Sequence, residues 1–357
     1  MFEIVLPRGA PRLLVLAALM LAPAPALAQQ DAPSSQDSSP AETQTSDDDR
    51  ATITALFEND LFFDADGNYT NGVQAAWTSP ALNYDDWLVR AARHLPLFSQ
   101  GTEIHKSYII GQNMFTPDDI SLKNPPLTER PYAGYLYGGL GLMAKTPGAS
   151  PAYDRLDQLE LQIGMVGPAS LARQAQTLVH KLRGFDTPKG WDTQLRNEPG
   201  VVLKYERIWR LRTPKLLGFE IQLDPHAGGA LGNVYTYANI GAMVRLGFEL
   251  PDDFGPVRAD PSLPGSYYFE PTSSPFGWYI FAGVDGRAMA RNIFLDGNSF
   301  VHSRSVDKKI FVGDFDFGVA VTIGNVRLTA THVFRTREYK GQKHEDEFGS
   351  LSMSYRY

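Results

Sequence analysis

The C-terminal segment 346–357 alternates between apolar and polar residues and ends on an aromatic side chain. Its last apolar positions are Leu351, Met353, Tyr355 and Tyr357, with two serines and an arginine between them. A period of two predicts a β-strand with one apolar and one polar face. The segment resembles the terminal strand of bacterial outer-membrane barrels, although an edge strand of a soluble sheet has the same alternation.

The same alternation recurs from residue 51 onward and predicts about twelve strands. Their approximate spans are 51–60, 69–80, 103–115, 131–146, 153–166, 200–212, 216–227, 233–248, 276–291, 308–322, 325–338 and 346–357. An even count predicts an all-β fold, a closed antiparallel transmembrane β-barrel with both termini on the periplasmic side. Apolar residues would then face lipid and charged residues the lumen, whereas a soluble sandwich would bury the apolar face.

The N-terminus favours the membrane barrel over the sandwich. Arg8 and Arg12 precede an apolar run that ends at Ala28 after a small-x-small sequence, so we interpret residues 1–28 as a signal peptide. Residues 29–50 are rich in Ser, Asp, Gln and Pro and are expected to form a disordered linker. The barrel would therefore occupy residues 51–357, where no apolar run is long enough for a transmembrane helix.

Composition excludes several classes of function. The chain has no cysteine, which excludes disulfides, zinc–thiolate sites and thiol nucleophiles. Its net charge of −7 argues against a nucleic-acid partner. The 16 Tyr, 20 Phe and 32 Gly are typical of sheets that close on themselves.

The connections between the predicted strands differ in character. The expected outward tips are 61–68, 116–130, 167–199, 228–232, 292–307 and 339–345. The third tip contains a predicted helix over 170–183, with Ser170 as N-cap and Gly184 after its end. Gln176 and His180 are neighbours on one face of it, at spacing i,i+4. At the opposite end, 81–102 and 249–275 are longer than ordinary periplasmic turns.

Polar side chains concentrate at the first outward tip. Glu58, Asn59 and Asp60 end the first strand, and Asp64 and Asp66 follow. Oxygen donors of this kind suit a hard cation such as calcium, although a hairpin turn has a similar composition. Alternation along the strand places Asn59 on the lipid-facing side and Asp60 on the lumen side.

A serine nucleophile has weak support in the sequence. His302 and Ser303 are adjacent, so in an extended segment they would point to opposite faces and could not share a proton. No G-x-S-x-G elbow is present. Among seven histidines, His180 is singled out by its helix and by Asp186 six residues later. The alternative for any lone histidine is a hydrogen-bonded structural role.

A set of short blocks resembles the outer-membrane lipid A 3'-O-deacylase (LpxR) family. Together the blocks are specific, and they occur in order through residues 58–298. They are Glu58-Asn59-Asp60, Tyr69-Thr70-Asn71-Gly72, residues 129–134, 164–168, 190–198 and 229–233, and Phe294-Leu295-Asp296-Gly297-Asn298.

The resemblance implies a calcium-dependent esterase that removes the 3'-linked acyloxyacyl chain of lipid A at the outer leaflet. The family's catalytic positions fall on His180, Asn59, Asp60, Thr70 and Asp186, where the family carries glutamate at the last position. Asn59 and Asp60 would hold Ca²⁺.

The same resemblance suggests the partners of the protein. Lys123 and Arg130 are expected to pair with lipid A phosphate. We expect a monomer in the bacterial outer membrane, with lipopolysaccharide as substrate and the site facing the cell exterior. The alternatives are a non-catalytic pore or structural barrel, which would be indifferent to these residues, and an outer-membrane phospholipase, which would prefer a serine nucleophile.

Overall fold

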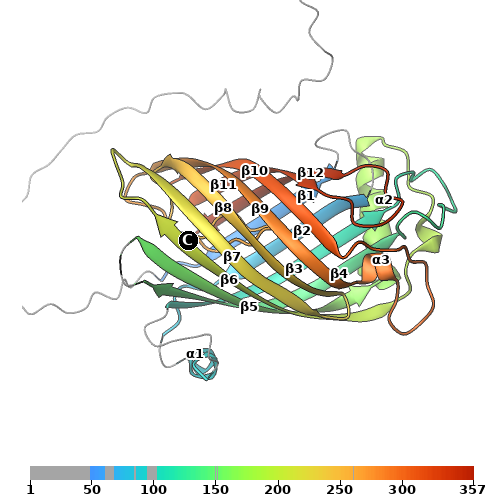
Figure 1. Ribbon diagram of the computed structural model, residues 1–357, viewed down its shortest axis with the longest axis horizontal. Coiled ribbons are helices and arrows are strands. Elements are labelled where there is room, and N and C mark those ends of the chain that lie inside the picture. Colours follow the sequence, from blue (N-terminus) through green and yellow to red (C-terminus); the bar gives the residue numbers. More distant parts are fainter. Residues whose placement is uncertain are drawn as a thin grey trace, which may run out of the picture. The chain divides into compact units, whose positions relative to one another are not determined.

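The chain folds into a closed barrel of twelve antiparallel strands in which β1 pairs with both β2 and β12 (Figure 1). The computed structural model describes residues 49–60, 68–83, 86–94, 103–148, 150, 152–259 and 261–357, with the backbone alone at 68–70. The predicted signal peptide, nearly all of the predicted linker, Asp64 and Asp66 lie outside these residues. No helix in the described part of the chain is long and apolar enough to cross a membrane.

The observed strands follow the predicted spans closely, and the predicted fold class is confirmed. The strands are β1 Thr52–Asn59, β2 Asn68–Thr78, β3 Glu103–Thr116, β4 Ala133–Pro147, β5 Tyr153–Val166, β6 Glu198–Arg212, β7 Phe219–Gly232, β8 Tyr235–Phe248, β9 Phe276–Asn292, β10 Phe311–Ile323, β11 Val326–Arg335 and β12 Asp346–Arg356. One tip was predicted wrongly, because residues 228–232 continue β7 as a strand.

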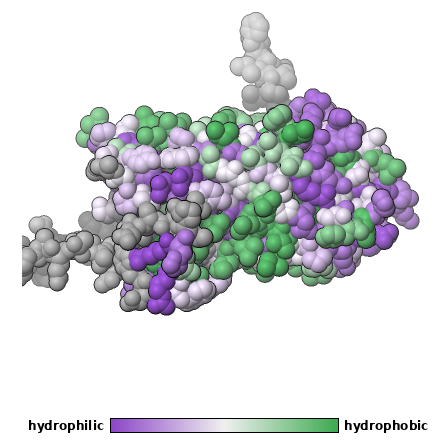
Figure 2. All heavy atoms as spheres, turned by 60° about the horizontal axis from the view of Figure 1, so that its bottom comes forward, coloured by the Kyte–Doolittle hydropathy of each residue, from purple (hydrophilic) through white to green (hydrophobic). Residues whose placement is uncertain are grey.

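The two faces of the wall differ in chemistry as the alternation predicts. In β12, Leu351, Met353 and Tyr355 are exposed, whereas Ser352 and Ser354 are buried towards the lumen. Figure 2 shows hydrophobic side chains gathered over the middle of the wall and hydrophilic ones towards the end that carries α2. This distribution matches a barrel whose outer surface lies in lipid.

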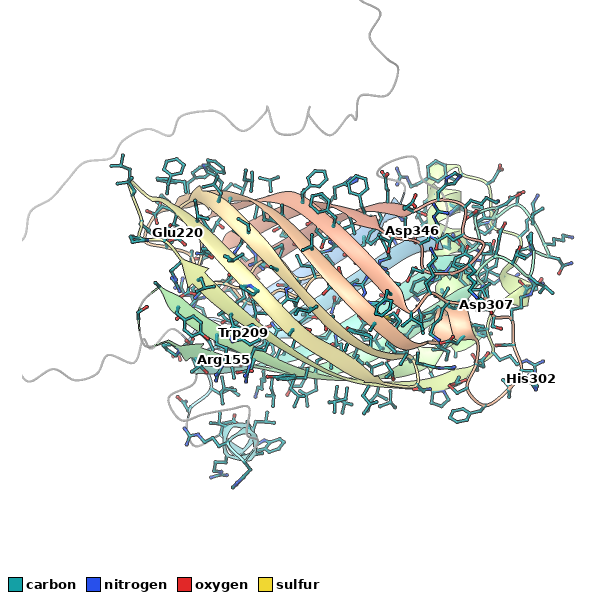
Figure 3. The ribbon with its side chains drawn as sticks, in the orientation of Figure 1. Arg155, Trp209, Glu220, His302, Asp307 and Asp346 are labelled. Carbon is teal, nitrogen blue, oxygen red and sulfur yellow. The ribbon has the colours of Figure 1, made fainter. Side chains whose placement is uncertain are left out.

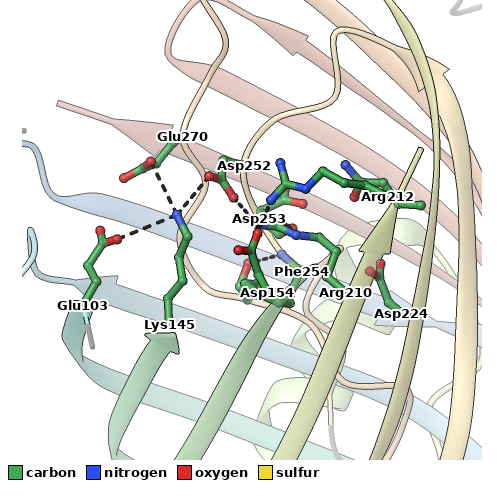
Figure 4. Close-up of polar contacts among 12 residues, drawn as sticks. Glu103, Lys145, Asp154, Arg210, Arg212, Asp224, Asp252, Asp253, Phe254 and Glu270 are labelled. Carbon is green, nitrogen blue, oxygen red and sulfur yellow. Dashed lines mark hydrogen bonds and ion pairs between the residues drawn. The ribbon is translucent and has the colours of Figure 1, made fainter. Parts of the chain in front are cut away.

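The long connection between β8 and β9 fills the lumen, which explains its length. Phe254 and Phe269 of this segment are completely buried. Asp253, also buried, accepts hydrogen bonds from Arg327 of β11 and, at 2.5 Å, from Arg245 of β8. Figure 4 shows this segment amid charged side chains of the surrounding strands. We call residues 249–275 the plug.

The described part of the connection between β2 and β3 packs on the outside of the wall. It contains the short helix α1, Trp87–Ala92. Val89 and Ala92 of α1 pack on Ile104 of β3 and Ala144 of β4. The plug thus lies inside the barrel, whereas α1 lies on its outer surface.

The helix of the third tip is shorter than predicted. The short helix η3, Pro168–Ser170, precedes α2, Ala172–Arg183, and the N-cap of α2 is Leu171 with φ 60°. The prediction of Ser170 as N-cap was wrong, because Leu171 holds that position. The Ser170 hydroxyl donates to the Gly167 carbonyl oxygen at 2.6 Å and accepts a long hydrogen bond of 3.4 Å from the Ala172 amide. The predicted glycine at the helix end is confirmed, since Gly184 has φ 71°.

Candidate functional site

Helix α2 packs against the outside of the barrel wall where β3 ends and β4 begins. Its Ala172 joins Met114 of β3, Tyr132 and Trp191 in one buried cluster. Gly134 of β4 permits this contact, because a Cβ there would lie 2.3 Å from the Cβ of Ala172. The fold therefore brings the helix into close contact with the wall.

The buried face of α2 is polar. Ala172, Gln176 and His180 are its buried residues, whereas Leu178 and Leu182 are exposed. Gln176 accepts a hydrogen bond from the indole nitrogen of Trp191 at 2.7 Å, in the short helix η4, Trp191–Thr193. Gln176 therefore orients the helix through Trp191, and its leucines face outward.

His180 is held by the chain that returns after the helix. Its Nδ1 lies 2.6 Å from the backbone carbonyl oxygen of Asp186. A carbonyl can only accept, so Nδ1 carries the proton and neutral His180 presents Nε2 as an acceptor. The left-handed conformation of Gly184 turns the chain, and the Phe185 amide donates to the His180 carbonyl at 2.9 Å.

A cavity of about 670 Å³ lies beside this histidine. Its wall includes Asp118 and Asp119, which follow β3, and Lys189 from the segment after α2. The Ser121 hydroxyl and amide donate to Asp119 at 2.6 and 2.9 Å, and these hydrogen bonds lower the pKa of Asp119. The cavity thus places a histidine nitrogen near the Asp119 carboxylate, which its lowered pKa keeps ionised at neutral pH.

The polar residues that end β1 separate into two environments. Glu58 faces the lumen and accepts from the Arg258 Nε of the plug at 2.6 Å, so it fastens the plug. Asn59 stands at a lipid-facing position of the alternation but is 8% exposed, and Asp60 is 1% exposed. Asn59 pairs with Asn71 of β2, which pairs with Met114 of β3. Asn59 on β1 is therefore two strands away from β3, against which α2 packs.

Thr70 occupies a β-bulge. Tyr69 pairs with Phe115 and Asn71 with Met114, so Thr70 is an extra residue between two paired positions. Bulges re-aim side chains and are frequent beside active sites. The Thr70 side chain is outside the described residues.

The two predicted phosphate contacts differ in accessibility. Lys123 is exposed in the connection between β3 and β4. Arg130 is completely buried, donates to Glu338 at 3.1 Å and lies 4.6 Å from the Phe115 ring centre. In this conformation Arg130 braces the rim rather than facing a ligand.

Calcium would require six to eight oxygen ligands. In the described ranges no three His, Asp or Glu side chains are grouped to hold a metal ion. Asn59 and Asp60 supply amide and carboxylate oxygens of the right chemistry, both at a buried position. The donor type of these two residues fits a hard cation.

Sequence analysis missed Asp118 and Asp119. The expected tip 116–130 contains them, but the predicted site residues of this tip were the basic Lys123 and Arg130. Their position directly after a strand end was the available signal, because strand ends at one rim converge on one region. Asp186 was singled out for its carboxylate, yet that side chain is exposed and its backbone makes the contact.

The fold and the rim together define a membrane β-barrel with a histidine-bearing cavity between the β3–β4 connection and the C-terminal end of α2. A family model described as outer membrane protein LpxR matches residues 13–357. The chain therefore belongs to the LpxR family of outer-membrane proteins, which implies a lipid A deacylase.

A solved structure shares the fold of this chain. LpxR from Salmonella typhimurium is 18% identical, with a TM-score of 0.67 over 85% of this chain and 99% of that one. The β domain of the Bordetella autotransporter BrkA is 9% identical, with a TM-score of 0.42 over 86% and 98%. No curated protein sequence matches the chain.

Proposed function

We propose that this protein hydrolyses the 3'-linked acyloxyacyl ester of lipid A in a calcium-dependent reaction. The observation that carries the proposal is the 2.6 Å contact from His180 Nδ1 to the Asp186 carbonyl, because it leaves Nε2 basic beside a cavity of about 670 Å³. A neutral imidazole positioned in this way is suited to act as a general base.

The reaction follows from that geometry. Nε2 of His180 takes a proton from a water molecule, whose oxygen attacks the ester carbonyl carbon. The ester C–O bond then breaks, and the imidazolium returns the proton to the sugar oxygen as it leaves. The Asp186 carbonyl keeps the ring oriented and stabilises its charged form.

Calcium, when bound, would supply positive charge to the developing oxyanion. Asn59 and Asp60 are the residues we propose to hold it. Thr70, displaced by the bulge, would position substrate or support the ion. The short path across β1, β2 and β3 connects these residues with the wall beneath α2.

Substrate charge would be met at the same rim. Lys123 is exposed and is our candidate for pairing with a lipid A phosphate. Arg130 would need to leave Glu338 to do so, and we assign it a bracing role. The exposed leucines of α2 would contact acyl chains in the outer leaflet, with the site towards the cell exterior.

The pore alternative has less support, since the plug fills the lumen with buried side chains such as Phe254 and Asp253. We propose that the protein acts as a monomer in the outer membrane after removal of residues 1–28. The phospholipase alternative has less support, because Ser121 lines the His180 cavity but its hydroxyl donates to Asp119 at 2.6 Å rather than to the histidine.

The test is mass spectrometry of lipid A from cells that produce the wild type, His180→Gln or His302→Gln. His302 is exposed on a loop of the same end of the barrel and serves as the matched control (Figure 3). Wild type and control should remove an acyloxyacyl mass and lose this ability when calcium is chelated. Unchanged lipid A with folded wild type in the presence of calcium would exclude the proposal.

A further inference from the structure

A group of charged side chains lies on the lipid-facing surface of β5 and β6. Asp157 accepts hydrogen bonds from the Tyr205 hydroxyl at 2.6 Å and from Arg207 Nε at 2.7 Å. Arg155 Nε lies 2.9 Å from its other carboxylate oxygen. The Asp157 side chain is 0% exposed, so two guanidinium groups and a phenol enclose it. We call these four residues the wall cluster.

The wall cluster faces outward by register. Asp157 pairs directly with Arg207 of β6 and with Ala144 of β4. It shares its face of β5 with Leu161 and Ile163, which are 38% and 60% exposed. Charged residues on the lipid-facing side of a barrel are costly at the bilayer centre and tolerated near its interfaces. The cluster is therefore expected at an interface.

The position of the wall cluster along its strands also places it near a membrane interface. Asp157 is four residues from the start of β5 at Tyr153, about 13 Å along the strand. Trp209, which pairs with Arg155, belongs to a residue type that collects at membrane interfaces. Figure 3 shows Arg155 and Trp209 together on the wall towards the end near α1.

Helix α1 lies on the neighbouring part of the same surface. Its Ala92 and Val89 pack on Ala144, the direct cross-strand partner of Asp157. Trp87 of α1 is 66% exposed, and Arg90 is exposed beside it. An apolar inner face, an outward Trp and a basic residue are typical of a helix that lies in the plane of a membrane interface.

The charges of the wall cluster do not balance. Two arginines surround one carboxylate, which leaves a net charge of +1. Arg155 and Arg207 are 25% and 27% exposed, and each directs Nε to Asp157, so the remaining guanidinium donors can serve a second acceptor. Arginine donors in this arrangement suit a phosphate group.

We propose that the wall cluster and α1 form a binding site for the phosphate of an anionic phospholipid in the periplasmic leaflet. The leaflet assignment rests on the orientation in the proposed function. The lipid phosphate contacts the guanidinium groups, and its acyl chains lie along the apolar wall beside Leu159 and Leu161. The site is separate from the His180 cavity, which is at the opposite end of the strands.

The test is native mass spectrometry of the full-length protein in detergent, titrated with phosphatidylglycerol or with phosphatidylcholine of the same acyl chains. The wild type should retain one phosphatidylglycerol more tightly than phosphatidylcholine. Arg207→Gln keeps a donor for Asp157 and the ion pair with Arg155 but removes the net charge. It should weaken phosphatidylglycerol retention about tenfold, the loss of one charge-assisted contact. Arg173→Gln, at an exposed pair on α2, is the control and should change nothing.

Three results would overturn the proposal. They are equal retention of both lipids by the wild type, equal phosphatidylglycerol retention by Arg207→Gln, and preferential retention of lipopolysaccharide that Arg207→Gln abolishes. Heat-dependent mobility in gel electrophoresis establishes that each variant is folded. The measurement needs no deacylase activity, so its failure and failure of the proposed function are distinguishable.

Discussion

The Nδ1 atom of His180 lies 2.6 Å from the backbone carbonyl oxygen of Asp186. The acidic side chain of Asp186 is exposed and does not define this contact. The orientation of the histidine therefore depends on the path of the chain after α2, in which Gly184 adopts φ 71°. The residue at position 186 can therefore orient His180 through its backbone, whatever its side chain is.

Substitution of Asp186 should have a small effect. Asp186→Glu and Asp186→Ala retain the carbonyl oxygen, so we expect kcat within about threefold of wild type, as for other exposed substitutions. Kinetics of lipid A deacylation by purified protein measure this. A loss of two orders of magnitude in Asp186→Ala with normal activity in Asp186→Glu would instead assign the role to the carboxylate.

Gln176 should support activity through Trp191. Gln176→Leu leaves the buried indole N–H without its acceptor, at a cost of about 1–3 kcal/mol. We expect looser packing of α2 and a fall in kcat. Gln176→Glu keeps an acceptor and is the matched comparison. Tryptophan fluorescence should shift in the leucine variant, and identical spectra and rates in the two variants would contradict this role.

The plug should close the barrel through Asp253. Asp253→Asn weakens the partner of Arg245 and Arg327, and breaking a buried ion pair costs about 3–5 kcal/mol. We expect the wild type to show little conductance in planar bilayers and the variant to show frequent openings. Asp307→Asn changes an exposed pair with Lys340 and is the control. A conducting wild type would contradict a sealed lumen.

Acid should loosen the same plug. Burial raises the pKa of Asp252, but Arg210 and Lys145 outweigh burial and hold this pKa well below its usual range. A carboxyl with a lowered pKa stabilises the folded state above its unfolded pKa of about 4 and loses this effect as the pH falls. Conductance should therefore be constant from neutral pH to about pH 5 and rise below about pH 4.

Asp252→Asn provides the comparison for that experiment. In the wild type, Asp252 forms ion pairs with Lys145 at 2.9 Å and with Arg210 at 2.6 Å. The asparagine of the variant carries no charge at any pH, so both ion pairs are lost. The variant should conduct more at neutral pH and respond less to acid. An unchanged acid response would assign the pH dependence to other carboxylates.

The strands were predictable because one face of each lies in lipid and the other in a polar lumen. The period of two records that difference over residues 351–356 of β12 and 158–163 of β5. The plug was not predictable from the same pattern. Its partners, such as Arg245 and Arg327, have the alternation of any lumen-facing residue, and only the folded chain brings Asp253 between them.

The candidate site was predictable in part. A lone helix with His180 could be located, and its end at Gly184 follows from the sequence. The sequence did not show which face of this helix is buried, because its apolar stripe with Leu178 and Leu182 faces away from the wall. In a soluble protein this stripe would be buried, whereas here the polar face packs inward and, under the proposed function, the leucines face apolar lipid.

The most direct measurement is the product of purified, calcium-loaded protein acting on defined lipid A. The account predicts release of the 3'-linked acyloxyacyl chain by the wild type. It predicts at least about a hundredfold slower release by His180→Gln, the loss expected for a general base. Equal rates for wild type and folded His180→Gln would contradict the central role of this histidine.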